Sequence, residues 1–585
     1  MAQRRFLITS ALPYSNGRLH VGHIAGAYLP ADTYVRYLRA RGEDVRFICG
    51  SDDNGVAALI TAKKENTTVE ELTARYNVRQ KTDFEGLGIH FDVYGGTHQP
   101  SCVELHNRIS QGFFKTIYDK GYFVKKTTEQ LYDPQAAQFL PDRYVKGTCY
   151  ECGDPGAYGD QCEACGISID PMRLIDPVST FTGTRPEPRQ TTHWYLQLQR
   201  FEEPLRKWLE SKRQADTPGS QWRDTVLNFA LGQIKQGLPE RAMTRDLHWG
   251  VPVPLDDPDA ADKVLYVWFD APIGYVSFTA RNCQDREGDW QAYTQWWKEP
   301  DCKIIHFIGE DNIVFHALTW PAMLIAEGSY ELPFQVVANA FLNIKFPGKD
   351  EEKISKSRGT AIWIEEYLTT FDPDPLRYYL TAIAPENQRT TFDVDEFINR
   401  NNTELLAALG NFINRTLTFA QRYFEGRVPE PGQRESIDRA QLDAIRATAD
   451  AMTGHLEAFR FKAALNELMA LARAANGYFD AKQPWKQRKD DMPGCGTTIN
   501  VCLQTVRALA TLMGPFLPFS AARCAAMLRL DGFDGADSAP GGAAAGEPVL
   551  PWAEAVEELS ASKQLGEPAI LFKKLDPVEL FGEQS

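Results

Sequence analysis

The chain contains no apolar run that could cross a membrane. A membrane-spanning helix needs about 20 consecutive apolar residues, and no stretch of the 585 residues approaches that length. The first ten residues, MAQRRFLITS, also lack the apolar core of a secretory signal peptide. With 43% hydrophobic and 24% charged residues, the composition is that of an ordinary globular protein, and we expect it to be cytoplasmic.

Basic residues are not in excess either. Lysine and arginine number 63 against 78 acidic residues, which gives a formal net charge of −15. This negative net charge argues against a protein that coats nucleic acid non-specifically. The protein surface would repel the phosphate backbone except where a local basic patch is present. Specific binding through such patches stays open. The length predicts about three or four domains, and the sequence shows no internal repeat.

A stretch near the N-terminus, RRFLITSALPYSNGRLHVGH, ends an apolar run with two histidines. A strand that stops at Pro13 and a helix that begins near Val21 would leave the first helical N–H groups unpaired and facing a gap that favours phosphate. His20 and His23 then share one face of the helix, and Gly22 lets a ligand approach the backbone. Taken alone, such histidines are as typical of surface or capping residues.

The helix after these histidines is predicted from its apolar spacing, which recurs every three to four residues until Gly42 offers a stop. Pro30 lies inside this pattern, and we expect it to interrupt and kink the helix. The apolar positions are Ile24, Ala27, Tyr28, Val35 and Leu38.

Four of the 11 cysteines are closely spaced, as C-x2-C-x9-C-x2-C in CYECGDPGAYGDQCEACG. Two such knuckles suit one tetrahedral zinc ion held by four thiolates. No ligand position is left for water, so we predict that the zinc is structural and holds an insertion together. The remaining cysteines are scattered, and we expect them to be buried or inert. The four predicted ligands are Cys149, Cys152, Cys162 and Cys165.

Two regions alternate strand-like and helix-like segments, which predicts a parallel sheet with ligands at the strand ends. In residues 4–115, RRFLITS and DVRFICG are predicted strands, and a helix begins near Val56. From about Val264 to Glu327, KVLYVWFD and KIIHFIG are predicted strands. After about residue 386 the apolar period becomes helical, which predicts a helix bundle. Residues 537–548 have the composition of a linker, after which the chain packs back or forms a small appendage.

A second candidate for phosphate chemistry is EEKISKSRGTAI, where Lys353 and Lys356 bracket serines in a glycine-containing loop. Mobile lysines can neutralise the charge of a leaving polyphosphate as its bond breaks. When this segment is taken alone, a solvated basic loop is the favoured interpretation.

HVGH followed far downstream by KISKS resembles the HIGH and KMSKS signatures of class I aminoacyl-tRNA synthetases. The resemblance narrows to the methionyl-tRNA synthetase family through ALPYSNGRLHVGH, FICGSDDNG, the four-cysteine insertion, MTRD, VWFDAPIGY, HFIGEDN, FHALTWPAML and KQPW, which span residue 4 to about residue 525. It implies a Rossmann-type α/β catalytic domain, a zinc-binding connective insertion and a C-terminal α-helical anticodon-binding bundle. The implied reaction joins methionine to the 3′ end of tRNA(Met), using ATP with Mg²⁺.

The resemblance also assigns residues to the two small substrates. Asp52 would hold the ammonium group of methionine, and aromatic walls suit its polarizable thioether; without the resemblance, the same aromatics fit a core. The implied methionine residues are Ala11, Leu12, Tyr14, Asp52, Trp268, Ala271, Pro272, Tyr275, His316 and Trp320. The implied ATP and catalytic residues are His20, Gly22, His23, Arg245, Gly309, Asp311, Lys353 and Lys356, of which Lys356 is expected to act on the transition state.

Two departures from the family pattern stand out. GEDN places Glu310 and Asn312 where relatives often carry lysine and isoleucine, which weakens Asn312 as a pocket residue. In the helical region, Thr418 stands where an arginine is expected, so either Arg415 compensates or the anticodon is read differently.

For the anticodon, the resemblance implies that Trp485, after Pro484, stacks on a base and that Asn414 hydrogen-bonds to one. A nearby basic cluster would offset the negative total charge, although a solvated helix end is an equal interpretation. The cluster comprises Lys482, Lys486, Arg488 and Lys489.

The predicted domain division places the two catalytic halves at 1–115 and 241–328, the zinc-bearing insertion at 116–240, the KMSKS-loop and stem-contact region at 329–385, the anticodon bundle at 386–535 and a linker with a C-terminal segment at 536–585. Only about forty residues follow the linker, with no further tRNA-binding domain, which favours a monomer.

Three alternatives stay open at this stage. A synthetase for isoleucine, valine or leucine would need a large editing insertion, and the cysteine enzyme would need zinc in its amino-acid pocket. A zinc-containing RNA-binding or regulatory protein could have lost catalysis on the same scaffold, although HVGH and KISKS are intact. A non-synthetase nucleotidyltransferase with an HxGH motif would leave the helical region unexplained.

Overall fold

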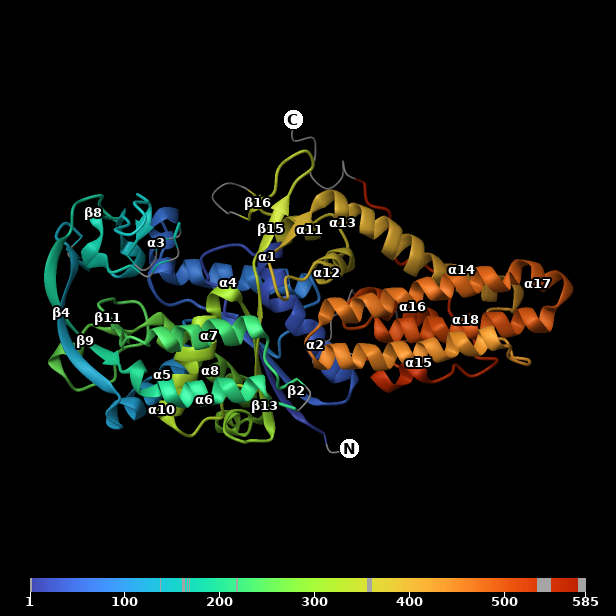
Figure 1. The fold of residues 1–585 in the computed structure, drawn as a ribbon, viewed down its shortest axis with the longest axis horizontal. Helices are drawn as coiled ribbons and strands as arrows, with labels where there is room; N and C mark the ends of the chain where they lie inside the picture. The colour runs from blue at the N-terminus through green and yellow to red at the C-terminus, as the bar shows by residue number, and fades with distance from the viewer. Residues whose placement is uncertain are drawn as a thin grey trace.

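The computed structural model describes residues 3–136, 138–159, 162, 164, 165, 167, 169–216, 219–354, 360–533 and 549–576. Figure 1 shows the strands and shorter helices of the N-terminal part on one side and the long helices α14 to α18 extending on the other. The predicted α/β region followed by a helical bundle is confirmed. Among the described residues, no helix has both the length and the apolar character needed to cross a membrane.

A central sheet of five strands has the order β14-β13-β1-β2-β3, and every neighbouring pair is parallel. The chain moves outward from β1 on one side and from β13 on the other, so the strand order reverses between β1 and β13. Sheets of this kind bind ligands beyond the carboxyl ends of the strands at that reversal. The strands are β1 (Arg5–Ser10), β2 (Asp44–Ser51), β3 (Val93–Gly96), β13 (Cys302–Gly309) and β14 (Gln335–Asn339).

The helix after β1 begins at Val21, as predicted, but Pro30 does not interrupt it. Helix α1 (Val21–His23) continues through a π-helical segment, η1 (Ile24–Tyr28), into α2 (Leu29–Ala40). The Leu29 N–H donates to the Ile24 carbonyl five residues earlier, and Pro30 has no N–H to donate. The helix therefore continues past Pro30, because the π-helical turn just before it widens the backbone. Gly42 follows the helix with φ of 75°.

The segment between the two halves of the sheet folds as an antiparallel insertion. One sheet has the order β10-β9-β4-β5 and a second has the order β7-β6-β8. Their strands are β4 (Phe123–Asp133), β5 (Gln138–Phe139), β6 (Val145–Thr148), β7 (Ala157–Tyr158), β8 (Ile175–Ser179), β9 (Glu187–Leu196) and β10 (Arg241–Ala242). Helices α6 (Glu202–Arg213) and α7 (Asp224–Gln236) follow β9.

The predicted strand in KVLYVWFD is wrong for most of its length. Of this segment, Val264–Leu265 forms a strand, β12, which pairs with β11 (Thr244–Arg245). Helix α8 (Val267–Glu287) begins two residues later. A short apolar run is equally compatible with a buried strand and a buried helix, and here nearly every residue of the first turns of α8 is buried. The strand predicted in KIIHFIG is confirmed as β13.

The segment after β14 forms a small sheet beside the central one, with the order β16-β15-β17. Its strands are β15 (Leu342–Lys345), β16 (Glu352–Lys353) and β17 (Thr390–Asp393). The helices around the central sheet are α3 (Val56–Glu65), α4 (Val69–Gly86), α5 (Val103–Asp119), α9 (Thr294–Trp297), α10 (Trp320–Glu327), α11 (Ile364–Leu368), α12 (Pro373–Ala382) and α13 (Val394–Arg400).

The helical bundle packs on the helix that follows β1, because one hydrophobic cluster contains residues of α2, α12 and the bundle. The chain after residue 548 packs back, as one of the two predicted outcomes: Trp552 contacts Tyr37 edge-on at 5.1 Å and donates to Thr453. The predicted linker lies outside the described residues. The bundle helices are α14 (Asn411–Tyr423), α15 (Ser436–Glu457), α16 (Phe461–Lys482), α17 (Pro484–Asp490), α18 (Met492–Leu512) and α19 (Pro518–Met527).

Candidate active site

The residues that follow β1, β2 and β13 meet at one edge of the central sheet. The Ala11 N–H donates to the Phe307 carbonyl at 2.9 Å, which extends the pairing of β1 with β13. Tyr14 forms an isolated parallel bridge with Asp52, and the Asp52 N–H donates to the Pro13 carbonyl at 2.9 Å. Gly309 ends β13. The sequence therefore delivers predicted residues from three strands to the reversal point, where the fold favours a ligand.

His20 and His23 form a compact pair at the start of the helix. His20 is the N-cap, and its Nδ1 accepts from the Gly22 N–H at 3.2 Å. His23 Nδ1 accepts from the His20 N–H at 3.1 Å, and the two rings stack at 3.7 Å. Because each Nδ1 accepts, each neutral ring carries its proton on Nε2. The rings thus act as caps, one of the two interpretations of the sequence.

The segment that carries KISKS packs directly against this histidine turn. The Val21 N–H donates to the Ile362 carbonyl, and the Ile364 N–H donates to the Leu19 carbonyl, both at 3.1 Å. A Cβ at Gly22 would approach the Ile354 side chain to 3.1 Å, so glycine permits this contact. Lys353 lies on β16. Lys356 lies outside the described residues, which resume at Thr360.

Asp52 is buried and has no counterion among the described side chains that contact it. Its side chain is 3% exposed, and its Oδ1 is a buried oxygen without a hydrogen-bond partner. Burial raises the pKa of this carboxyl well above its usual range, and the neighbouring Asp270 and Asp53 raise it further. An unpaired buried carboxylate is costly unless a cation reaches it, so Asp52 is suited to an ammonium group.

Aromatic rings surround the same sheet edge. Tyr14 contacts Trp268 edge-on at 6.5 Å, and Trp268 stacks on Phe315 at 3.7 Å. Ala271 and Pro272 lie in the first turns of α8, where both are buried. Trp320 lies deeper, because its ring contacts are with Phe113 and Trp297.

His316 is held as a neutral imidazole. Its Nδ1 lies 3.1 Å from the Asn312 carbonyl, to which only an N–H can donate, and its Nε2 therefore accepts from the Tyr275 hydroxyl at 2.9 Å. Burial lowers the pKa of His316 to about 4. Tyr275 and His316 thus satisfy each other's polar groups and leave apolar ring faces, which suits a long uncharged side chain. Asn312, the departure from the family pattern, contributes here through its backbone.

Glu310, the other departure from the family pattern in GEDN, lies in the turn after β13. Glu310 pairs with Arg389 at 3.1 Å, so its side chain has a partner within the chain. Asp311 accepts from the Asn312 side chain at 3.2 Å. A Cβ at Gly309 would lie 2.7 Å from the Asp311 carboxylate, so glycine leaves room for the observed position of that side chain.

Arg245 lies on β11 rather than on the edge of the central sheet. Its guanidinium stacks over the Tyr266 ring at 3.8 Å and donates to the Ala242 and Thr244 carbonyls, both at 2.9 Å. Tyr266 immediately precedes α8, which carries Trp268. The packing therefore links Arg245 to the methionine side of the predicted site.

The four predicted zinc ligands come together in the insertion. Their sulfur atoms all lie within 4.8 Å of one another; Cys149 Sγ is 3.9 Å from Cys165 Sγ, and Cys152 Sγ is 3.6 Å from Cys162 Sγ. A tetrahedron with Zn–S bonds of about 2.3 Å has sulfur–sulfur edges of about 3.8 Å, so the thiolates fit one zinc ion. The other cysteines are all buried, as predicted.

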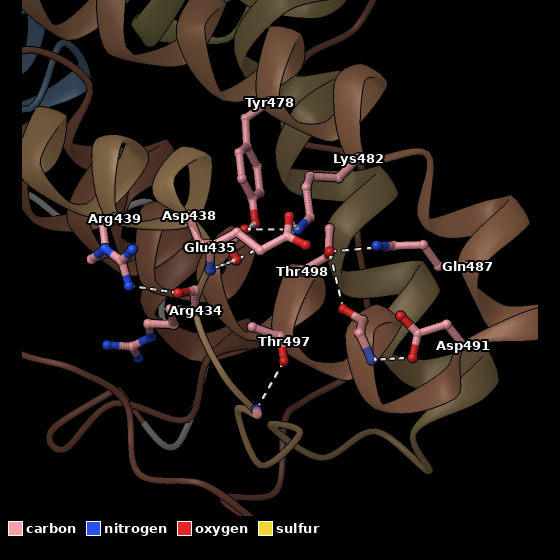
Figure 2. A network of polar contacts seen from close by, with 12 residues as sticks. Arg434, Glu435, Asp438, Arg439, Tyr478, Lys482, Gln487, Asp491, Thr497 and Thr498 are labelled. Atoms are coloured by element: carbon pink, nitrogen blue, oxygen red, sulfur yellow. Dashed lines mark hydrogen bonds and ion pairs between the residues drawn. The ribbon is translucent and has the colours of Figure 1, made fainter.

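Figure 2 shows the polar network at the base of α17, the predicted anticodon-contact helix. Buried Asp438 accepts from the Tyr478 hydroxyl at 2.6 Å and pairs with Lys482 at 3.1 Å. On the other side of the turn, Thr498 donates to Gln487 of α17 at 2.9 Å. Lys482, which the sequence places in a basic cluster for RNA, is instead an internal ion-pair partner of Asp438 and Glu435.

Trp485 projects from this supported turn. It is 37% exposed, and one face stacks on Phe479 at 6.0 Å. Pro484 is buried at the first position of α17, and Asn414 is half-buried on α14. Arg415, the proposed substitute for the arginine absent at Thr418, pairs with Asp480 at 3.1 Å.

Sequence reasoning missed the residues that organise the site from behind. Asp270 accepts from Asn54 at 2.6 Å and lies 3.3 Å from His106, with all three buried. The Trp363 ring covers His20 edge-on at 5.9 Å. The FICGSDDNG and VWFDAPIGY motifs contain Asn54 and Asp270, but no local pattern indicates that these two side chains meet.

The parallel sheet with its reversed strand order, the histidine turn and the packing of the described residues on either side of KISKS against that turn define a class I aminoacyl-tRNA synthetase. A family model described as "tRNA synthetases class I (M)" matches residues 6–417, and one described as "Anticodon binding domain of methionyl tRNA ligase" matches residues 428–580. The chain belongs to the methionyl-tRNA synthetase family.

Individual relatives agree with this membership. The methionine–tRNA ligase of Bacteroides fragilis is 45% identical over 577 residues, which cover 98% of this chain and 79% of the relative. That of Pyrococcus furiosus is 44% identical over 581 residues, covering 97% and 75%. The crystal structure of Mycobacterium tuberculosis methionyl-tRNA synthetase bound by methionyl-adenylate has a TM-score of 0.76 at 25% identity and covers 97% of this chain and 100% of that chain.

Proposed function

We propose that this chain, as an ATP-dependent methionine–tRNA ligase, forms methionyl-adenylate at the edge of the central sheet and transfers methionine to tRNA(Met). In the first step a carboxylate oxygen of methionine attacks the α-phosphorus of ATP, and pyrophosphate leaves. In the second step a ribose hydroxyl of the terminal adenosine attacks the acyl carbon, and AMP leaves. No side chain becomes covalently attached, so positioning and charge neutralisation carry the rate.

The amino acid would be held by its ammonium group and its side chain. Asp52, with its partnerless buried Oδ1, supplies the negative charge. Tyr14, Trp268 and the Tyr275–His316 pair supply apolar surface for the thioether. Ala11, Leu12, Ala271 and Pro272 complete this side, and Trp320 supports it from the buried layer behind.

The nucleotide would lie between the histidine turn and the KISKS segment. His20 and His23, with protons on Nε2, can donate to phosphate oxygens, and Gly22 lets the phosphates approach the backbone. Gly309 and Asp311 face the ribose. Arg245, Lys353 and Lys356 bind the phosphate chain as charge leaves with pyrophosphate, and Mg²⁺ arrives bound to ATP.

This proposal depends mainly on the convergence of three segments at one sheet edge: the strand end with Asp52, whose buried Oδ1 has no hydrogen-bond partner, the histidine turn, and the residues beside KISKS that bond to that turn. Charging of a tRNA(Met) transcript with labelled methionine tests it. We expect methionine to be attached to this transcript and not to one with a substituted anticodon. Attachment no greater than in a reaction without tRNA would contradict the proposal.

The peripheral assignments complete the proposed function. The four-cysteine cluster holds one structural zinc ion; Trp485, Pro484 and Asn414 contact the anticodon. The domain division given by the sequence, with boundaries at residues 115, 240, 328, 385 and 535, remains our proposal, as do a monomeric state and a cytoplasmic location. The apposed thiolates support the metal, and the exposed ring of Trp485 supports the RNA contact.

A further inference from the structure

The π-helical turn behind the two histidines leaves one backbone carbonyl without its helical partner. In an α-helix the Ala25 carbonyl would accept from the Leu29 N–H, but that N–H donates to Ile24. The next residue, Pro30, has no N–H. The Asn339 side chain fills this position: its Nδ2 donates to the Ala25 carbonyl at 2.9 Å. The widened turn is thus completed from β14, far away in the sequence.

Asn339 is itself held by an arginine of the insertion. Its Oδ1 accepts from Arg223 Nη1 at 2.9 Å, and the Asn339 side chain is 1% exposed. The same Nη1 donates to the Ala338 and Glu386 carbonyls, at 2.9 and 2.8 Å. Both ends of the amide are therefore used, which fixes its orientation toward Ala25.

The second arm of Arg223 reaches the helical bundle. Arg223 Nη2 donates to the Phe459 carbonyl at 2.8 Å, in the turn between α15 and α16, where Phe459 has φ of 55°. The Phe459 ring, 3% exposed, packs on Tyr34 of α2 at 4.8 Å. Figure 1 shows the ends of α15 and α16 beside α2. The bundle thus reaches the histidine helix through the Phe459 ring and through Arg223 and Asn339.

We propose that Asn339 and Arg223 are positioning residues for adenylate formation. Asn339 stabilises the π-helical register of the turn behind His20 and His23, and Arg223 orients Asn339 while it binds the bundle. Return to an α-helical register would shift the start of the helix by one residue relative to α2, which corresponds to about 100° of rotation. With α2 fixed by its packing, the two histidines would then no longer face the nucleotide. This inference rests on the proposed function of the histidine turn.

A double-mutant cycle on the full chain separates positioning from general support. Asn339→Asp is nearly isosteric and keeps an acceptor for Arg223, but it cannot donate to Ala25. Asn339→Ala removes both contacts, and Arg223→Gln removes the guanidinium. Arg507→Gln is the matched control, because Arg507 donates to the Glu557 carbonyl at 2.6 Å at the junction of the bundle with the C-terminal segment. Methionine-dependent ATP–pyrophosphate exchange without tRNA gives kcat and KM, and thermal unfolding reports on folding.

We expect Asn339→Asp and Asn339→Ala to lower kcat about tenfold or more with the KM for methionine within twofold of wild type. We expect Arg507→Gln to leave kcat unchanged. If Arg223 acts through Asn339, the double variant Arg223→Gln/Asn339→Ala loses no more kcat than Asn339→Ala alone.

Two results would overturn the inference: a kcat within twofold of wild type for Asn339→Asp, or losses that multiply in the double variant. If Asn339→Ala does not fold, the Asn339→Asp result decides. Failure of the wild-type chain itself to exchange would instead refute the proposed function, so the two failures are distinguishable.

Discussion

At the scale of single residues, the site is built from groups whose own partners are missing or unusually arranged. Asp52 is buried without a counterion, whereas burial keeps His316 neutral and two hydrogen bonds orient its ring. The sequence alone identifies Asp52 and His316 only through the family resemblance. The protonation of Asp52 depends in part on Asp270, and the orientation of the His316 ring depends on Tyr275. In each pair the two residues are far apart in the sequence, so no local pattern could predict these interactions.

Methionine binding should weaken as the pH falls. The ammonium group requires an ionised Asp52, and the pKa of this carboxyl is raised by burial and then by Asp270 and Asp53. Below that pKa the carboxyl is neutral, so the KM for methionine rises as the pH is lowered through it and levels off above it. Exchange kinetics across acid to neutral pH measure this.

The control for this dependence is Asp52→Asn, which cannot ionise. The KM of this variant for methionine should be about two orders of magnitude above that of the wild type, because a buried charged partner is lost. It should also no longer vary with pH in the range where Asp52 titrates. A wild-type KM that stays constant with pH, or a variant that keeps the wild-type KM, would contradict the role of Asp52.

Lys356→Ala should slow adenylate formation by about 10²-fold or more, because one donor to the developing charge is lost. The KM for methionine should stay nearly unchanged, since the lysine acts on the phosphate chain. Exchange kinetics separate the two parameters, and Lys349→Ala, at an exposed lysine upstream of KISKS, is the matched control. An equal loss of methionine affinity would argue against a transition-state role.

At the scale of elements, strands and amphipathic helices were predictable, and local departures were not. The helix start at Val21 and its stop before Gly42 are confirmed. In the π-helical turn, the Ala25 carbonyl accepts from Asn339, which lies far away in the sequence on β14. The local sequence could therefore predict only a kink at Pro30. The strand predicted at Val264 is mostly helix α8, because an apolar run buried all round carries no period that separates the two structures.

The zinc knuckle should contain one zinc ion per chain by elemental analysis. Cys162→Ser should reduce the zinc content to near zero and expose the insertion to proteolysis, since three thiolates do not close the tetrahedron. Cys524→Ser, at a buried thiol of α19, should retain the zinc. Equal zinc in the two variants, or none in the wild-type chain, would contradict the assignment.

Trp485→Ala should reduce charging of full-length tRNA about tenfold or more, because stacking on a base contributes about 1–3 kcal/mol. Exchange without tRNA should be unaffected, since the ring lies on the bundle. Trp485→Phe should retain most of the charging activity because it keeps a stacking face. A parallel loss of exchange and charging in Trp485→Ala would contradict an anticodon role.

At the scale of the whole molecule, the α/β region with the predicted active site and the helical bundle are joined by direct packing. One hydrophobic cluster runs from the helix after β1 into the bundle, and Phe459 inserts its ring against Tyr34. Composition shifts could predict that a helical region follows an α/β region. They could not predict this junction, because its contacts join residues hundreds of positions apart.

In the proposed function, the edge of the central sheet selects methionine and activates it with ATP. The most direct test is ATP–pyrophosphate exchange by the full chain with each of the twenty amino acids in turn, without tRNA. We predict exchange that depends on methionine and is far weaker with any other amino acid. Exchange supported best by another amino acid, or by none, would contradict the selection of methionine at this sheet edge.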